Sequence, residues 1–203
     1  MTALPRRRPW KFAKEAATLD RLSGGRLVVG VGIGGTWDFL PFGEETAEPV
    51  RGRMLDEGLD VVTGLWRGAP MDHAGEHFTL RGAQITPSPC QRPRIPIWVA
   101  GYWPGARPFR RAARWDGVAP VRQGHTFEGL TPDELSDCVE YVRRHRQTDE
   151  PFDVVQFGTG RDWLGKHVSD YERAGATWWL EAAAPTGERP ADFLERLRAG
   201  PPG

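Results

Sequence analysis

The sequence predicts an α/β protein in which parallel strands alternate with helices. Short runs of continuous apolar and β-branched residues recur along the chain, as is typical of strands that are covered on both faces of a parallel sheet. Between these runs, apolar residues lie three and four positions apart, which predicts helices that pack on the sheet. Right-handed crossovers then bring the carboxyl ends of the strands to one edge, where ligands bind.

The predicted order is one helix followed by five strand-helix units in a single domain over 1–203. Strands are expected at 26–31, 95–101, 116–121, 152–157 and 177–181. Helices are expected at 11–19, around a face of Leu55, Leu59, Val62 and Trp66, at 106–114, from Thr131 onward, at 162–174 and at 190–197. Residues 34–50 and 67–94 are expected to be long loops.

The clearest helix start is the segment from Thr131 to Glu134. Threonine is a good N-cap, proline suits the first turn, and a glutamate three residues after the threonine completes a capping box. The face of this helix that should be buried carries Leu135, Cys138, Val139 and Val142.

The composition indicates a folded cytoplasmic protein and argues against two classes of partner. The chain has 27 basic and 27 acidic residues, and this net charge of zero gives no overall field that would attract nucleic acid or an anionic membrane. No segment has the roughly 20 apolar residues that a membrane span requires, and no signal-length apolar stretch follows Arg6, Arg7 and Arg8. The two cysteines, Cys90 and Cys138, lie far apart and suit a reducing compartment.

A glycine-rich segment, Gly30-Val31-Gly32-Ile33-Gly34-Gly35, follows the first predicted strand. Its spacing matches the pattern that lets backbone amides approach a pyrophosphate, but that pattern requires a helix directly after the last glycine. Proline and aromatic residues follow here without a helical period. The favoured interpretation is that these glycines let the strand end pack closely or line a ligand loop.

The turn Gly101-Tyr102-Trp103-Pro104-Gly105 lies between a predicted strand and a predicted helix. Backbone amides at such a turn, together with the helix dipole, favour a phosphate group. This turn is the preferred anion site. The alternative is a plain connecting turn on which Tyr102 and Trp103 pack.

Other candidate residues give weaker signals. His73 and His77 flank Glu76, but Gly75 lies between them and makes a shared helical face improbable, so no metal is expected. His125 follows the third predicted strand and is a candidate for proton transfer, with an exposed loop histidine as the alternative. No sequence pattern supports either cysteine as a nucleophile.

Several motifs resemble the luciferase-like monooxygenase family, whose members are flavin- and deazaflavin-dependent oxidoreductases. The first of them is the segment from Leu19 to Gly32, which reads LDRLSGGRLVVGVG, and the resemblance is specific from about residue 4 to 121. The others come in the family's order: Arg51–Leu59, Gly64–Trp66, Gly75–Phe78, Pro93–Gly101 and Ala112–Gly117.

The resemblance implies part of an eight-stranded (βα) TIM barrel, with the five predicted strands corresponding to strands four to eight. It implies an N-terminally truncated chain and a cofactor that is coenzyme F-420 (a deazaflavin) or FMN. By the same resemblance, Gly32, Gly34 and Gly35 match the loop after the fourth strand. The cofactor's phosphate-side loop corresponds to Ala100, Gly101, Tyr102, Trp103 and Gly105.

Some family members place a catalytic acid in the loop after the fourth strand, where this chain has Gly35. Asp38 lies nearby but is not equivalent, so no catalytic residue can be transferred. Two functions therefore stay open. The first is hydride transfer or monooxygenation of a small-molecule substrate, and the second is a non-catalytic remnant that needs association with another chain. The resemblance also admits a homodimer, since family members often pair.

Overall fold

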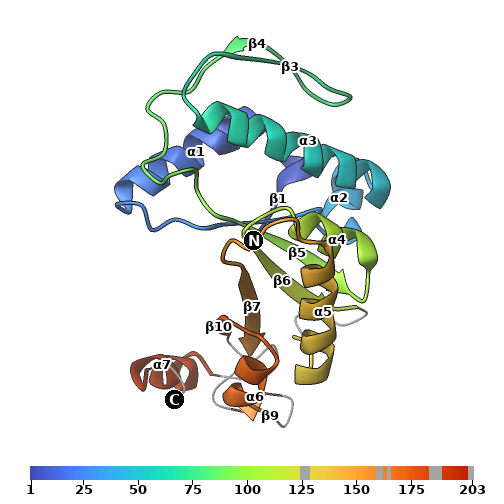
Figure 1. Cartoon of the computed structure of the whole chain (residues 1–203), viewed down its shortest axis with the longest axis vertical. Coiled ribbons are helices and arrows are strands. Elements are labelled where there is room, and N and C mark those ends of the chain that lie inside the picture. Colours follow the sequence, from blue (N-terminus) through green and yellow to red (C-terminus); the bar gives the residue numbers. More distant parts are fainter. Residues whose placement is uncertain (124–128, 159–161, 164–165, 183–188, 201–203) are drawn as a thin grey trace. The chain divides into compact units, whose positions relative to one another are not determined.

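The computed structural model describes residues 1–123, 129–158, 162–163, 166–182 and 189–200 (Figure 1). The chain divides into two compact units, Met1–Trp98 and Val99–Gly203. The first unit contains β1 (Thr2–Ala3), η1 (Leu4–Arg6), α1 (Pro9–Leu22), β2 (Val29–Gly32), α2 (Thr36–Phe39), η2 (Leu40–Phe42), α3 (Glu48–Trp66), β3 (Met71–Ala74), β4 (Thr79–Ala83) and the start of β5 (Ile97–Trp103).

The two long helices of the first unit, α1 and α3, pack against each other. The predicted apolar face of α3 is confirmed, since Leu55, Leu59 and Val62 are fully buried and Trp66 is nearly so. The indole Nε1 of Trp66 donates a hydrogen bond of 2.9 Å to the backbone carbonyl of Ala13 on α1. This bond satisfies the polar atom of a large buried ring and aligns one helix along the other.

The strand predicted at 26–31 begins later, as β2. The backbone carbonyl of Leu27 accepts a hydrogen bond from the side chain of Gln91, so this part of the chain does not join the sheet. A further strand, β1, pairs with β2 in parallel, with Thr2 opposite Val31 and Ala3 opposite Gly32. The prediction omitted β1 because two residues carry no readable periodicity.

The two segments expected to be loops contain regular structure. Residues 34–50 include the short helical turns α2 and η2, and residues 67–94 include an antiparallel hairpin of β3 and β4. The hairpin is largely exposed, so its strands lack the apolar signal of a buried strand. Its main support is a tertiary contact with α3, which local sequence patterns do not report.

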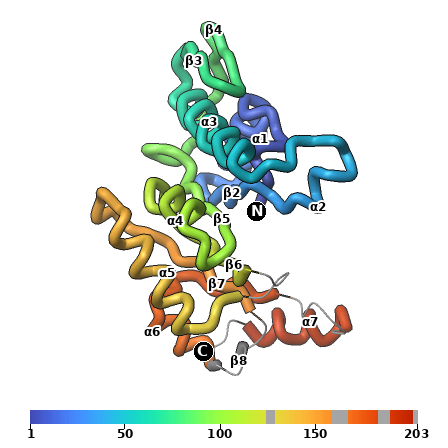
Figure 2. The backbone as a smooth tube through the Cα atoms, turned by 90° about the vertical axis from the view of Figure 1, so that its right-hand side faces the viewer, coloured from blue at the N-terminus to red at the C-terminus, as the bar shows by residue number. Residues whose placement is uncertain are grey.

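The second unit continues the alternation of strands and helices. It contains the rest of β5, α4 (Ala106–Ala112), β6 (Gly117–Arg122), α5 (Pro132–His145), β7 (Asp153–Gly158), β8 (Asp162–Trp163), β9 (Lys166–His167), α6 (Val168–Arg173), β10 (Trp178–Glu181) and α7 (Pro190–Arg198). Helix α4 packs on α5 and on β6, as Figure 2 shows in the backbone trace.

A six-stranded sheet runs in the order β1-β2-β5-β6-β7-β10. The pairs β1–β2, β6–β7 and β7–β10 are parallel. The predicted α/β fold with parallel strands and flanking helices is therefore confirmed, with six strands in the sheet where five were expected.

The helix predicted at 162–174 is shorter than expected, because α6 begins only after His167. The backbone N–H of His167 donates to Asp170 over 2.9 Å, and its ring Nδ1 accepts from the backbone N–H of Ser169 over 3.2 Å. These reciprocal bonds cap the helix and start it at Val168. The short strands β8 and β9 occupy the preceding stretch.

The capping box predicted at the start of α5 is present. The hydroxyl of Thr131 accepts from the backbone N–H of Glu134, and the carboxylate of Glu134 accepts from the backbone N–H of Thr131 over 2.8 Å. The predicted buried face is also confirmed, with Leu135, Cys138, Val139 and Val142 out of solvent.

Removing this cap should destabilise the protein. We expect Thr131→Ala to lower the free energy of unfolding by about 1 kcal/mol, because it leaves a backbone donor at the helix start without its partner. Urea denaturation followed by circular dichroism measures the change. Ser136→Ala, which removes an exposed hydroxyl from the same helix, is the control and should change stability by less than about 0.5 kcal/mol. Equal losses in both variants would contradict the role of the cap.

Candidate functional site

The residues predicted to bind a cofactor lie in two segments, one in each unit. Gly32, Gly34 and Gly35 follow β2 in the first unit. Ala100, Gly101, Tyr102 and Trp103 lie in β5 in the second unit, because this strand continues to Trp103, past the predicted end at residue 101. Gly105 follows in the short connection to α4, so the connecting turn is shorter than predicted.

Close packing explains why glycine occupies the end of β2. Gly34 has a backbone φ of +73°, and a Cβ there would lie 2.5 Å from Cε2 of Phe39 and 2.8 Å from Cβ of Ala3. A Cβ on Gly35 would lie 2.3 Å from Nε1 of Trp37. The helix that follows, α2, has four residues, which is far from the long helix of a dinucleotide-binding turn.

Beside this segment lies a buried arginine, Arg51, in the first turns of α3. Its Nη2 donates to the hydroxyl of Thr36 over 3.2 Å, and its guanidinium carbon lies 4.5 Å from the centre of the Phe39 ring. Its Nε and Nη1 atoms have no hydrogen-bond partner among the described residues. A guanidinium stays charged at every physiological pH, so burying it with two donors unsatisfied is costly unless an anion binds.

Arg51 was not among the site residues predicted from the sequence, although the sequence carries a signal for it. Arg51 precedes Leu55 by four residues and Leu59 by eight, so it continues the apolar face of α3. An arginine on a buried helical face is unusual and marks a position that needs a partner.

Large apolar side chains are exposed next to this arginine. Trp37, Leu40 and Phe42 are 64%, 67% and 70% exposed. Arg6 lies over the rings of Phe39 and Phe42 and forms an ion pair of 2.6 Å with Glu44, which holds the segment in place. Three exposed large apolar side chains within one short segment make it a candidate for contact with a ligand or partner.

In the second unit, the turn after β5 packs closely onto α4. A Cβ on Gly101 would lie 2.2 Å from Cβ of Pro108, so only glycine fits there. The ring of Trp103 packs edge-to-face on Phe109, with ring centres 5.1 Å apart, whereas Tyr102 is exposed. Trp103 is therefore part of the packing beneath the turn.

The predicted anion site lies at the start of α4. Gly105 is the N-cap residue, and no side chain caps the helix among the described residues. The backbone N–H of Gly105 itself donates to the carbonyl of Tyr102 over 2.9 Å. Any anion at this turn would therefore meet the amides that follow Gly105.

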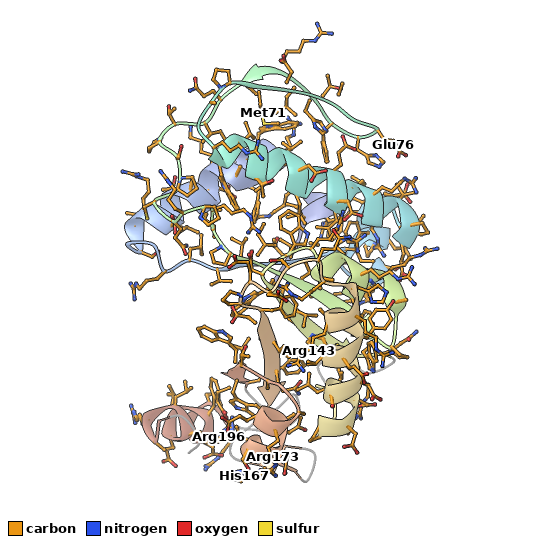
Figure 3. The ribbon with its side chains drawn as sticks, viewed as in Figure 1. Met71, Glu76, Arg143, His167, Arg173 and Arg196 are labelled. Atoms are coloured by element: carbon orange, nitrogen blue, oxygen red, sulfur yellow. The ribbon has the colours of Figure 1, made fainter. Side chains whose placement is uncertain are left out.

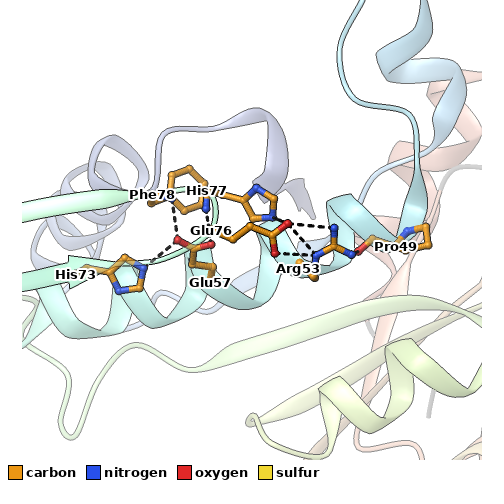
Figure 4. A network of polar contacts seen from close by, with 7 residues as sticks. All are labelled: Pro49, Arg53, Glu57, His73, Glu76, His77 and Phe78. Carbon is orange, nitrogen blue, oxygen red and sulfur yellow. Dashed lines mark hydrogen bonds and ion pairs between the residues drawn. The ribbon is translucent and has the colours of Figure 1, made fainter.

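The histidines near Glu76 belong to a hydrogen-bonded clamp centred on Glu57 of α3 (Figure 4). The Glu57 carboxylate accepts from the backbone amides of His77 and Phe78 over 2.9 and 2.7 Å, and it lies 3.0 Å from Nε2 of His73. Glu76 instead forms an exposed ion pair with Arg53. The clamp ties the β3–β4 hairpin to α3.

The clamp also affects the ionisation of Glu57. Burial of the carboxyl would raise its pKa, but the hydrogen bonds from His73 and from the two backbone amides outweigh burial and lower the pKa below 4.5. The carboxylate is therefore ionised at neutral pH.

Both cysteine thiols have a raised pKa, which disfavours the thiolate that a nucleophile requires. Burial raises the pKa of the Cys138 thiol to about 12. The hydrogen bond from the Cys90 thiol to the Asp20 carboxylate, 3.2 Å long, raises the pKa of Cys90.

The two other candidate residues are Asp38 and His125. Oδ1 of Asp38 lies 3.9 Å from Nη1 of Arg6. His125 lies outside the described residues.

The fold defines an α/β protein with a mostly parallel sheet, and sequence comparison gives the family. Residues 1–159 match the family model described as luciferase-like monooxygenase, and the chain therefore belongs to the luciferase-like monooxygenase family. The resemblance inferred from the motifs is confirmed.

Two relatives show how far the likeness extends. An uncharacterised protein of Mycobacterium bovis is 35% identical over 156 residues, which is 74% of this chain and 49% of that protein. The oxygenase component of a flavin-dependent trigonelline monooxygenase from Acinetobacter baylyi is 34% identical over 106 residues, which is 50% of this chain and 28% of that protein. The chain thus spans about half the length of the first of these relatives.

Solved structures support the fold. An F420-dependent secondary alcohol dehydrogenase, in complex with an F420-acetone adduct, has a TM-score of 0.69 and 18% identity, covering 87% of this chain and 69% of that chain. The oxygenating constituent of 3,6-diketocamphane monooxygenase from Pseudomonas putida, in complex with FMN, has a TM-score of 0.58 and 18% identity. The match covers 79% of this chain and 47% of that chain. Within the described part of this chain, no helix is long and apolar enough to cross a membrane.

The Glu57 clamp predicts a pH-dependent stability. A carboxyl whose pKa is lowered by folding adds stability above its ordinary pKa, and this contribution is lost as the pH falls through the lower value in the folded state. We expect Glu57→Gln to lower the free energy of unfolding by about 1 to 3 kcal/mol at neutral pH, and by less in acid. Urea denaturation at several pH values measures the difference.

Glu76→Gln is the control for this experiment, since Glu76 lies in the same hairpin turn but is exposed. Its effect should be small at every pH. A loss in Glu57→Gln that stays constant from neutral pH into acid would contradict the assigned role of the ionised carboxylate.

Proposed function

We propose that this chain belongs to an oxidoreductase that uses reduced FMN or a reduced deazaflavin to transfer hydride to, or oxygenate, a small-molecule substrate in the cytoplasm. Family membership supports the class. The names of the relatives and of the similar structures include both F420-dependent and flavin-dependent enzymes, which supports either cofactor. When bound, such a cofactor supplies the hydride or the oxygen chemistry, and the protein supplies binding, orientation and exclusion of water.

The observation that carries the proposal is the buried guanidinium of Arg51. Its unpartnered Nε and Nη1 fit an anionic group, and both cofactors carry a phosphate. Arg51 and the hydroxyl of Thr36 would hold that phosphate in the first unit. Phe39 beneath the guanidinium would keep water away and strengthen the ion pair.

Two further segments take part in the proposal. Gly32, Gly34 and Gly35 are proposed to line the loop beside the bound group, and Gly34 lets this loop pack on Phe39. Trp37, Leu40 and Phe42 offer an apolar surface to the substrate. The turn from Ala100 to Gly105 is the second candidate for the phosphate, because uncapped amides begin α4 there.

A second function stays in consideration because the chain spans about half the length of the first curated relative it matches. In this alternative the chain has no catalytic activity of its own and acts only in association with another chain. Binding of a cofactor by the chain alone separates the two proposals.

The test is a fluorescence titration of the chain with coenzyme F420 and with FMN. We expect saturable binding of one of them, and we expect Arg51→Met to weaken it by at least about tenfold, because the variant keeps the buried stem but loses the charge. Arg53→Met is the control, since Arg53 is exposed on the same helix and pairs with Glu76.

Three outcomes are informative. Equal affinity in the wild type and in Arg51→Met, with loss in an Ala106→Pro variant, would move the phosphate to the start of α4, because proline fits the first helical position but removes one of the free amides there. Equal affinity in all variants would remove both phosphate sites. No binding of either cofactor by the chain would favour the non-catalytic alternative.

A further inference from the structure

Arg51 has two donors that solvent does not reach. Its side chain is fully buried, and its Nε and Nη1 atoms have no hydrogen-bond partner among the described residues. An anion can therefore meet these atoms only after a group that covers them has moved. Two of the groups around the guanidinium belong to α2: the hydroxyl of Thr36 accepts from Nη2 over 3.2 Å, and the ring centre of Phe39 lies 4.5 Å from the guanidinium carbon. Access to Arg51 thus depends on whether α2 can move.

The segment that contains α2, residues 36–42, is held in place by little buried surface. It consists of the short helices α2 and η2, and no side chain caps either of them. Phe39 is the one buried residue of this segment, all of which the structure describes. Glycines in the left-handed region stand on both sides of it, with a φ of +73° at Gly34 and +64° at Gly43. Short elements with few buried side chains are those that open most readily in a folded protein.

The segment is fastened by Arg6, which lies in η1 of the same unit. The guanidinium carbon of Arg6 lies 5.3 Å and 5.1 Å from the ring centres of Phe39 and Phe42. Its Nε forms an ion pair of 2.6 Å with Glu44, and its Nη1 lies 3.9 Å from Asp38. Each of these contacts contributes a modest stabilisation. Removal of this single side chain should therefore increase the open population of the segment without unfolding the unit.

We propose that residues 36–42 form a lid over Arg51, that Arg6 is the latch of this lid, and that an anion reaches the Arg51 guanidinium only in the open form. The identity of the anion as a cofactor phosphate rests on the proposed function, whereas the lid and its latch do not. A ligand that binds only a minor form associates more slowly and with lower apparent affinity, in proportion to the population of that form. Arg6 thus controls the rate of anion binding through the lid.

The first test measures access to Arg51 in the absence of any ligand. Phenylglyoxal modifies exposed guanidinium groups, and peptide mass spectrometry gives the modification rate at each arginine. We expect Arg6→Met to raise the rate at Arg51 at least about fivefold, because the variant loses the cation–π contacts and the ion pair that keep the lid closed. Arg53 is the internal reference, since it is exposed on the same helix and pairs with Glu76 in the turn of the hairpin (Figure 3). Its modification rate should be equal in all variants.

Arg7→Met is the matched control. Arg7 also forms an exposed ion pair, 3.1 Å long, with Glu15, and its guanidinium carbon lies 5.8 Å from the ring centre of Phe12. Both partners lie on α1, outside the lid. An unchanged rate at Arg51 in Arg6→Met, or an equal rise in Arg7→Met, would contradict the latch.

A milder variant keeps the test decisive if Arg6→Met does not fold, which circular dichroism and urea denaturation show. Glu44→Gln removes the ion pair of Arg6 and keeps its two ring contacts. We expect it to raise the modification rate at Arg51 by about twofold to threefold, less than the full loss of Arg6. A rate equal to that of the wild type would show that the ion pair does not hold the lid.

The second test connects the lid to binding. Stopped-flow fluorescence measures the association rate of FMN and of coenzyme F420 with the wild type, Arg6→Met and Arg7→Met. We expect the cofactor that binds to associate at least about threefold faster with Arg6→Met, and at an unchanged rate with Arg7→Met. Faster modification of Arg51 without faster association would overturn the role of the lid in binding.

A different outcome separates this inference from the proposed function. If neither cofactor binds but Arg6→Met still speeds the modification of Arg51, the proposed function fails and the lid remains. Inorganic phosphate, compared with chloride at equal ionic strength, is then the probe for the anion. Slower modification of Arg51 in phosphate would support an anion site under the lid, and an equal rate in both salts would remove that site.

Discussion

The buried charge of Arg51 is the constraint on which the first unit depends. The guanidinium of Arg51, which stays charged, is buried against the ring of Phe39. It donates one hydrogen bond, to the hydroxyl of Thr36. The segment after β2 must therefore stay close to the start of α3. Gly34 makes this approach feasible, because a Cβ there would collide with Phe39. The Nε and Nη1 donors of Arg51, which have no hydrogen-bond partner among the described residues, are the physical basis of the proposed phosphate site.

Buried carboxylates connect the irregular segments of the first unit to its helices. The Glu57 carboxylate on α3 accepts hydrogen bonds from the backbone amides of the hairpin turn. Asp20, at the end of α1, accepts in the same way from the backbone and side chains of Cys90 and Gln91. Burial raises the pKa of Asp20, but the hydrogen bonds outweigh burial and lower it. Polar contacts of this kind give irregular segments a defined position without a large apolar core.

The second unit follows simpler rules, since local signals and apolar packing account for most of it. The capping box starts α5, and α5 packs on α4 and α6. Where this logic ends, at α7 and β10, apolar side chains stay exposed and the attachment is polar.

Elements with a strong local signal were predictable from the sequence alone: the buried face of α3, the capped start of α5, and strands such as β6 and β7. The motifs also gave the family, because they combine residue types with spacing. Tertiary structure decided the rest. The β3–β4 hairpin is held by hydrogen bonds to Glu57, and the late start of β2 follows from the hydrogen bond between Gln91 and Leu27. Arg51 finds its hydrogen-bond partner in Thr36, fifteen residues earlier. Each is a contact between residues distant along the chain, and no local periodicity records such contacts.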